Sequence, residues 1–216
     1  MARPERRQRE FLRREEEILD AALSLCACSD FESVRVDQIA ERSDVGKGTV
    51  YKHFSSKDDL LFRLYMRFYR GLLEEMRARA GDRAGDPIEQ LRFIFHHAFD
   101  YHVKYRDYRY VIEYVERNDF KERAEASWRE DFLSLDRAFL EWGGPIIEAG
   151  MQRGDFPERR LEDVLTGVRA CFSGALRMLW ATDDWCVSCE LDSDKIVASA
   201  TEFMIMGITG GLRTGV

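Results

Sequence analysis

The sequence predicts an all-α fold, and three observations support that prediction. Apolar residues recur every three or four positions along most of the chain, which is the period of a helix with one buried face. Clusters of glycine, proline and aspartate separate the periodic segments, as at residues 81–87 and 154–157. No stretch alternates apolar and polar residues as a half-exposed strand would, and no internal repeat is visible. The 216 residues suffice for one or two domains with a sizeable core.

The N-terminal region is rich in arginine and then becomes periodic. Residues 14–28 form the first expected helix, because Ile18, Ala22 and Leu25 fall on one apolar stripe. Residues 3–14 are expected to be a flexible basic arm that leads into this helix.

Two short helices around a tight turn are expected in residues 36–54. Ile39 and Ala40 form the apolar face of the first helix, and Ser43-Asp44-Val45 interrupts it. Such a pair, with a small residue where the helices approach, has the form of a helix-turn-helix. The outward positions of the second helix carry cations, hydroxyls and an imidazole, which suit phosphate oxygens and base edges. These outward residues are Lys47, Thr49, Tyr51, Lys52 and His53.

The remaining periodic segments predict a series of longer helices. Ser55 or Ser56 is expected to cap a helix that reaches residue 79, and Pro87 to open the next, with Val103 on its buried stripe. Gly143-Gly144-Pro145 is expected to break or kink a helix, because proline lacks a backbone donor. Further helices are expected at residues 108–117, 120–141, 146–152, 161–180 and 192–206.

Several blocks around the short helices stand in a fixed order and spacing. They comprise residues 18–23, 36–40, 47–54 and 56–61, with Phe31 after the first block. In these blocks the chain resembles the DNA-binding domain of the TetR family of bacterial transcriptional regulators. The resemblance implies a three-helix helix-turn-helix domain in residues 1–60, and a helical effector-binding and dimerisation domain in residues 61–216.

The chain departs from the usual family pattern at four positions. Asp44 stands at the turn in place of glycine, although aspartate tolerates a left-handed backbone. Arg35 replaces a threonine that caps the first helix of the motif, and arginine cannot cap in that way. Gly46 replaces serine, and Asp30 replaces a second glycine.

The resemblance implies a homodimer that binds palindromic operator DNA through the second short helix. Lys47, Gly48 and Thr49 are expected nearest the base edges, with phosphate contacts from other side chains. The full set of expected DNA-binding residues is Arg35, Lys47, Gly48, Thr49, Tyr51, Lys52, His53 and Lys57. The basic arm is expected to be either a solvated leader or a contact to phosphates or the minor groove.

The net charge of −7 is distributed unevenly along the chain. Residues 1–14 carry six arginines against two glutamates, and residues 35–57 carry five cations against three acids. Residues 58–216 carry 22 cations against 29 acids. An acidic body with a basic end would orient the approach to DNA.

The last two expected helices have wide apolar faces with many small residues. Such faces suit close helix packing and exceed what one neighbour covers. They are either an ordinary core pair or, as the resemblance implies, half of a four-helix dimer interface. The small residues are Gly167, Ala170, Ser173, Gly174, Ala175, Ala198, Ser199 and Ala200.

Aromatic residues and histidines are dense between Phe93 and Phe132. They either fill the core or line a cavity for a small apolar or aromatic effector that releases a repressor from DNA. The candidate walls are Phe95, Phe99, Tyr110, Tyr114, Trp128, Phe132 and Phe172, with His96 and Arg169 as polar anchors.

Other function classes receive little support from the sequence. No G-x-S-x-G, phosphate-binding glycine loop or H-E-x-x-H occurs, so we expect no enzyme and no cofactor. His96 and Asp100 alone are weak evidence for a metal site. The five cysteines are most simply free thiols, although Cys186 and Cys189 have the C-x-x-C spacing of a zinc site or a redox switch. The alternatives are therefore control by thiol redox state or by a protein partner, or an adaptor that has lost DNA binding. With no secretory leader and no membrane-spanning run, we expect a cytoplasmic protein.

Overall fold

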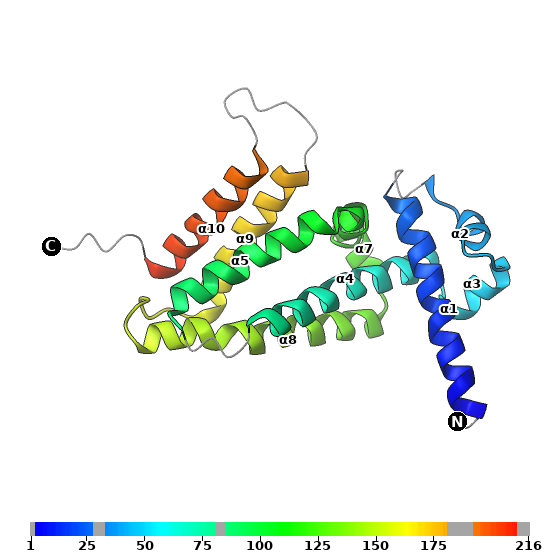
Figure 1. Cartoon of the computed structure of the whole chain (residues 1–216), viewed down its shortest axis with the longest axis horizontal. Coiled ribbons are helices and arrows are strands. Elements are labelled where there is room, and N and C mark those ends of the chain that lie inside the picture. Colours follow the sequence, from blue (N-terminus) through cyan, green and yellow to red (C-terminus); the bar gives the residue numbers. More distant parts are fainter. Residues whose placement is uncertain (1–2, 28–32, 81–84, 181–191, 211–216) are drawn as a thin grey trace. The chain divides into compact units, whose positions relative to one another are not determined.

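The computed structural model describes residues 3–27, 33–80, 85–180 and 192–210. Every regular element in these ranges is helical, which confirms the all-α prediction (Figure 1). None of these helices is long and apolar enough to cross a bilayer. The elements are α1 (Arg3–Cys26), α2 (Val36–Arg42), α3 (Lys47–His53), α4 (Lys57–Ala80), α5 (Pro87–Lys104), the 3-10 turn η2 (Arg106–Tyr108), α6 (Arg109–Val115), α7 (Asn118–Arg123), α8 (Ala126–Gln152), α9 (Leu161–Trp180) and α10 (Ser193–Thr209).

The chain divides into two compact units. The first unit comprises Met1–Arg70 with Tyr105–Phe132, and the second comprises Gly71–Lys104 with Leu133–Val216. The helices α4 and α8 therefore contribute residues to both units. The expected functional boundary at residue 60 stays a prediction.

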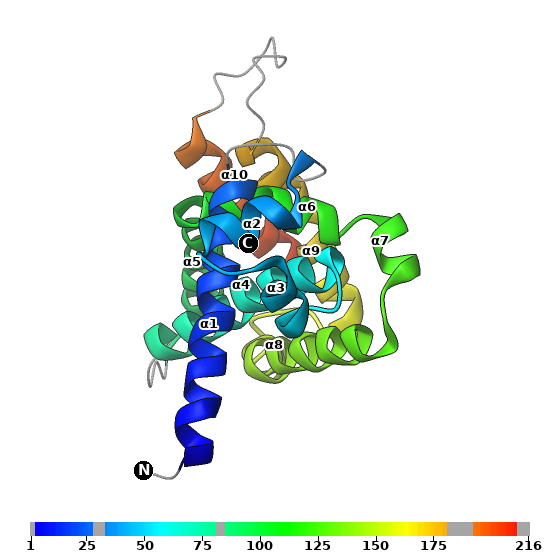
Figure 2. The same cartoon turned by 90° about the vertical axis from the view of Figure 1, so that its right-hand side faces the viewer.

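In the first unit α1, α2, α3 and the first turns of α4 pack together (Figure 2). Each of these helices turns an apolar stripe inward, and burial of such side chains contributes about 1.5–3 kcal/mol each. The most deeply buried members are Ile18, Ala22, Ile39, Val50, Phe54, Leu61 and Leu64, all at most 2% exposed.

The basic N-terminal segment is helical, so the expectation of a flexible arm is wrong. Residues 3–14 form the first turns of α1. Arg13 pairs with Glu10 and Glu17, and Arg14 lies 3.0 Å from Glu17. Arginine and glutamate are good helix formers, and pairs three or four residues apart stabilise an exposed helix. The helix thus extends about three turns beyond its buried stripe.

The turn between α2 and α3 uses the left-handed backbone expected at Asp44, whose φ is 52°. The following residue closes the turn, because the Val45 backbone N–H donates to the Ala40 carbonyl at 3.0 Å. Arg35 precedes α2 without a side-chain cap, as expected; instead the Gln38 side-chain oxygen accepts the Arg35 backbone N–H at 2.8 Å.

The start of α4 shows which of two serines is the cap. The Ser56 hydroxyl accepts the Asp59 backbone N–H at 3.0 Å, and the Asp59 carboxylate accepts the Ser55 backbone N–H at 2.8 Å. This reciprocal pair satisfies two donors that a helix start would otherwise leave open.

The helix does not break at residues 143–145, because α8 runs through Pro145 to Gln152, and the alternative expectation of a kink stays a prediction. An internal proline costs about 3 kcal/mol. Packing offsets this cost: Gly144 lies against the Leu161 and Leu140 side chains, and Ile147 is buried. The break occurs earlier, where Ala124 is extended between α7 and α8.

The second unit buries α5 against α9 and α10. Phe99 and Ile208 are among its most deeply buried residues. Val103 was expected on the buried stripe of α5 but is 47% exposed, whereas His102 is 1% exposed. Two neighbouring helices cover α5, so its buried face is wider than one stripe and is rotated away from Val103.

The buried His102 is held as a neutral imidazole. Its Nδ1 lies 2.7 Å from the Ala98 carbonyl oxygen, and its ring packs edge-on against Phe172. Burial lowers the pKa of His102 to about 4, although the hydrogen bond to Ala98 opposes that shift. The folded state thus resists protonation that the unfolded chain accepts near pH 6.5.

We predict that this histidine makes the protein less stable in mild acid. A folded pKa below the unfolded value gives stability that is present above about pH 6.5 and is lost as pH falls toward 4. Between pH 7 and pH 5 the loss is about 2 kcal/mol. Urea unfolding at both pH values should show this loss in the wild type and a smaller loss in His102→Leu. The control His96→Asn should keep the wild-type difference, and an unchanged pH dependence in His102→Leu would contradict the assignment.

Candidate nucleic-acid interface

The helix α3 presents a basic, polar edge outward. Val50 is 2% exposed and anchors the helix to the first unit, whereas Tyr51 is 49% exposed. Lys47, Gly48 and Lys52 are exposed as well. A side chain added at Gly48 would meet no atom within 4 Å, so a large partner could approach the backbone closely here.

Lys47 is positioned by an acid of the preceding helix. Its Nζ lies 2.8 Å from the Asp37 carboxylate, and this hydrogen bond raises the pKa of Lys47. Both side chains are more than half exposed. Exposed pairs of this kind are weak, so Lys47 remains charged and can turn to a competing anion.

The other expected contacts flank α3. Arg35 is exposed at the residue before α2, Thr49 is half-buried in the first turn of α3, and Lys57 is half-buried at the first residue of α4. These three residues thus stand at the starts of α2, α3 and α4.

His53 does not share this outward face. Its side chain is 5% exposed and stacks on Phe11 of α1, with ring centroids 4.0 Å apart. Its Nδ1 lies 3.8 Å from the Glu15 carboxylate. His53 therefore fastens α3 to α1, and its expected phosphate contact is not supported. The signal missed in the sequence is Phe11, an apolar residue inside the arginine-rich segment.

A charged cluster joins α4 to α1 and to η2. Arg67 Nη1 lies 2.8 Å from both Glu16 and Asp20, and Arg67 Nε donates to the Tyr108 hydroxyl at 2.8 Å. Burial opposes the charge of Arg67, but Tyr108 and the two carboxylates outweigh it, so the pKa is raised.

A second cluster reaches the first turn of α4. The Tyr114 hydroxyl donates to Asp58 at 3.0 Å, and Arg123 Nε donates to the same carboxylate at 2.7 Å. Both clusters lie within the first unit and fix the helix that carries Lys57. Sequence reasoning missed them, because the partners are about 40 to 65 residues apart.

The expected pocket residues are divided between the two units. Tyr110, Tyr114, Trp128 and Phe132 belong to the first unit. Trp128 stacks on Phe62 and Phe120 there, and Arg109 lies over Tyr110, as in ordinary packing. The other expected residues belong to the second unit and are Phe95, His96, Phe99, Arg169 and Phe172.

The second unit contains a groove of about 710 Å³ between α5, α8 and α9. Phe95 and Arg169 line it, and Met76 of α4 adds to its wall. Phe99 and Phe172 instead stack on each other, 4.4 Å apart. The groove therefore takes two of the expected residues and many that aromatic density did not indicate.

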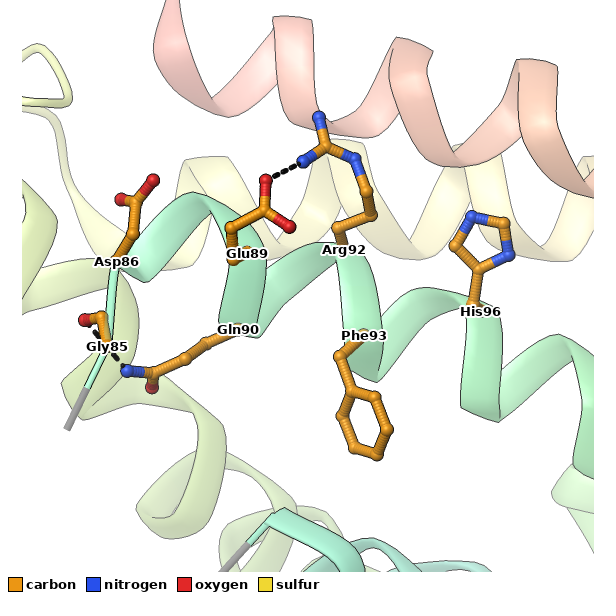
Figure 3. Close-up of a pocket in the computed structure, with 7 residues that line it drawn as sticks. All are labelled: Gly85, Asp86, Glu89, Gln90, Arg92, Phe93 and His96. Atoms are coloured by element: carbon orange, nitrogen blue, oxygen red, sulfur yellow. Dashed lines mark hydrogen bonds and ion pairs between the residues drawn. The ribbon is translucent and has the colours of Figure 1, made fainter. Parts of the chain in front are cut away.

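His96 lies at a different place, a depression of about 390 Å³ (Figure 3). One segment supplies all of its described lining, from Gly85 to His96. Arg92 there pairs with Glu89 (Figure 3). It also pairs with Glu202 of α10, so its charge is already balanced. Single-sided depressions of this kind bind small molecules poorly, since pockets enclose most of a ligand.

Metal and thiol chemistry find little support in the described ranges. No three histidine, cysteine or acidic residues there are placed to hold one metal ion. Burial raises the pKa of Cys26 to about 12 and also raises the pKa of Cys171, so both thiols stay protonated at neutral pH. Cys28, Cys186 and Cys189 lie outside the described residues.

Comparison with known proteins gives a family to the DNA-binding region. The sequence profile described as "Bacterial regulatory proteins, tetR family" matches residues 18–64. The transcriptional repressor KstR of Mycolicibacterium smegmatis is 36% identical over 81 residues, which are 38% of this chain and 39% of that protein. The regulator YhgD of Bacillus subtilis is 26% identical, over 63% of this chain and 69% of its own. The chain thus matches well under half the length of KstR.

The fold of this chain matches that of solved structures over nearly its whole length. FadR of Bacillus subtilis, solved in complex with stearoyl-CoA, superposes with a TM-score of 0.70 at 19% identity, over 89% of this chain and 98% of that one. At 19% identity the likeness is one of fold and carries no information about the ligand. The profile match and the related repressors show that residues 18–64 form a DNA-binding domain of the tetR family of bacterial regulatory proteins, and the rest of the chain shares the helical fold of FadR.

Proposed function

We propose that this protein is a repressor that binds a palindromic operator as a homodimer and is released by a small apolar effector. The observation that carries the proposal is the exposed basic edge of α3, held on the first unit by Val50. An α-helix fits the major groove, which is about 12 Å wide. The family membership of residues 18–64 supports the same role.

The proposed contacts divide into base and phosphate contacts. Lys47, Gly48 and Thr49 stand first in α3 and approach the base edges, as in other helix-turn-helix proteins. Arg35, Tyr51, Lys52 and Lys57 hold phosphates. The half-sites then lie about 34–36 Å apart, or at a multiple of that distance.

The helical form of the N-terminal segment argues against the minor-groove contact considered for it. A helix about 10 Å across does not enter a minor groove about 6 Å wide. Arg6 and Arg7 are exposed on the first turns of α1, which continues to Phe11 beside α3. We therefore assign these arginines to phosphates rather than to the minor groove.

A dimer surface is proposed on α9 and α10, which lie side by side (Figure 1). Phe203 is 68% exposed, and Met178 and Met206 are nearly half exposed. Side chains added at Gly167 or Gly174 of α9 would meet nothing within 4 Å. An exposed apolar face of this kind, with room for close helix approach, suits a second copy of the chain in a four-helix arrangement.

Two residues expected on that dimer face are buried within the protomer. Ala175 is 6% exposed and Ala200 is 9% exposed. Both belong to the inward stripe of their helices, so they cannot serve as contacts to a second copy. The proposed interface therefore lies on the opposite faces of α9 and α10.

The groove of the second unit is the proposed effector site, and α4 is the proposed link. Met76 of α4 lines the groove, while Lys57 opens the same helix at the proposed DNA surface. Both residues belong to the single helix Lys57–Ala80. A ligand that favours one position of α4 by about 1–3 kcal/mol would change DNA affinity about 5- to 150-fold.

We predict different effects from a phosphate contact and a base contact. Lys57→Ala should weaken binding to all DNA sequences alike and reduce the salt slope by about 0.9 for each lost contact, or about 1.8 in a dimer. Lys47→Ala should instead relax the choice of base in operators selected from random duplexes. Fluorescence anisotropy from 50 to 200 mM salt measures both effects. Lys195→Ala, an exposed lysine of α10, serves as the control; the contact map is wrong if all three variants behave alike.

We also predict that charge on the outer face of α9 and α10 separates the dimer. Gly174→Glu and Phe203→Glu add a carboxylate where the protomer has open space or an exposed ring. Sedimentation velocity should show monomers with unchanged helicity and weakened operator binding, because two linked half-sites act through effective concentration. Val103→Glu, at an exposed position of α5, should remain dimeric. Dimeric Phe203→Glu and Gly174→Glu proteins would rule this interface out.

A further inference from the structure

The groove between α5, α8 and α9 has apolar walls and a charged rim. Its walls include Ile94 and Phe95 of α5, Trp142 and Ile147 of α8, and Leu165 of α9. Its volume of about 710 Å³ lies in the range of about 300–1,000 Å³ typical of small-molecule sites.

The charges on this rim are balanced by one another. Among the described lining residues the charged ones are Asp136, Glu162 and Arg169. Arg169 Nη2 donates to the Asp136 carboxylate at 2.9 Å, and Glu162 accepts from Arg160 at 2.5 Å. Arg169 is the one basic residue in the described lining, and it already has an acidic partner. The rim therefore offers no unpaired cation to an anionic ligand.

Polar groups that suit an uncharged ligand are present. Thr166 lines the groove, and its hydroxyl donates to the Glu162 carbonyl oxygen at 2.7 Å, so its oxygen can still accept a hydrogen bond. The Ser173 hydroxyl also lines the groove. A ligand hydroxyl could be satisfied here without a charge entering the apolar walls.

We propose that the groove selects an uncharged apolar molecule with a hydroxyl group and rejects carboxylates, with Asp136 as the residue that sets this preference. A carboxylate would lose hydration and would have to compete with Asp136, which lies 2.9 Å from Arg169, for the one guanidinium among the described lining residues. A neutral alcohol loses far less hydration and keeps the gain from apolar burial. The inference rests on the proposed effector site only in its location, since ligand binding is measurable without DNA.

The test compares two ligands of equal chain length on the full-length protein, 1-decanol and decanoate, at pH 7.5 by isothermal titration calorimetry. Decanol should bind the wild type at least about tenfold more tightly than decanoate, which is about 1.4 kcal/mol. Asp136→Asn keeps the side-chain shape, removes the acid and leaves Arg169 for the ligand. It should raise decanoate affinity about tenfold and leave decanol within about twofold.

Matched variants separate this explanation from general loss of negative charge. Glu141→Gln removes an exposed acid of α8 that does not line the groove, and should leave both affinities unchanged. The double variant Asp136→Asn with Arg169→Gln should lose the gain in decanoate affinity, because the gain requires the guanidinium.

Several results would overturn the proposal. Equal binding of both ligands to the wild type, or an equal gain in Glu141→Gln and Asp136→Asn, would remove the role of Asp136. Binding of neither ligand, or decanol binding only in monomeric Gly174→Glu, would show that the groove is not a ligand site in the intact protein. None of these results bears on operator binding, and loss of operator binding would not alter the ligand preference.

Discussion

The continuity of α4 is the constraint on which the two halves of this molecule depend. Its first turns bury Leu61 and Leu64 completely in the first unit. Its last turns belong to the second unit, where Met76 forms part of the groove wall. Gly71 lies where these stretches meet, and a side chain there would come within 2.5 Å of the Tyr101 hydroxyl. A mid-helix glycine costs about 1 kcal/mol relative to alanine, and here close packing requires it.

Ion pairs and hydrogen bonds also hold the first part of α4. Arg67 joins α1 and η2 to α4, and Asp58 receives hydrogen bonds from α6 and α7. Removing one member of a part-buried cluster leaves its partners without compensation, which costs more than the cluster contributes when intact. The surface that carries Lys57 is thus held by residues far away in sequence, and any motion of α4 must involve them.

The sequence predicted the structure well where neighbouring residues alone determine it. Periodicity located the helices at residues 161–180 and 87–104, and the aspartate at the α2–α3 turn adopts the left-handed backbone that its chemistry permits. Local rules were insufficient where a distant partner decides. Pro145 remains helical because its neighbours are buried, and His53 is covered by an extension of α1 that composition alone made to look flexible.

The residues of the candidate effector site could not be predicted for the same reason. Aromatic density between Phe93 and Phe132 indicated a cavity, but aromatic side chains fill cores and line pockets alike. Trp128 fills the core of the first unit, whereas the aromatic residues that line the groove are Phe95, Phe139 and Trp142, two of which lie outside the aromatic-rich segment. Which residues share a groove depends on helix packing, and single-sequence periodicity does not determine that packing.

The central claim is that two copies of this chain read one symmetric DNA site through α3. Hydroxyl-radical footprinting of the purified protein on the DNA upstream of its own gene tests this claim most directly. The account predicts two protected patches related by a two-fold axis, separated by about 10 base pairs or a multiple, and lost as salt rises. A single patch without symmetry, or protection of every sequence alike, would contradict it.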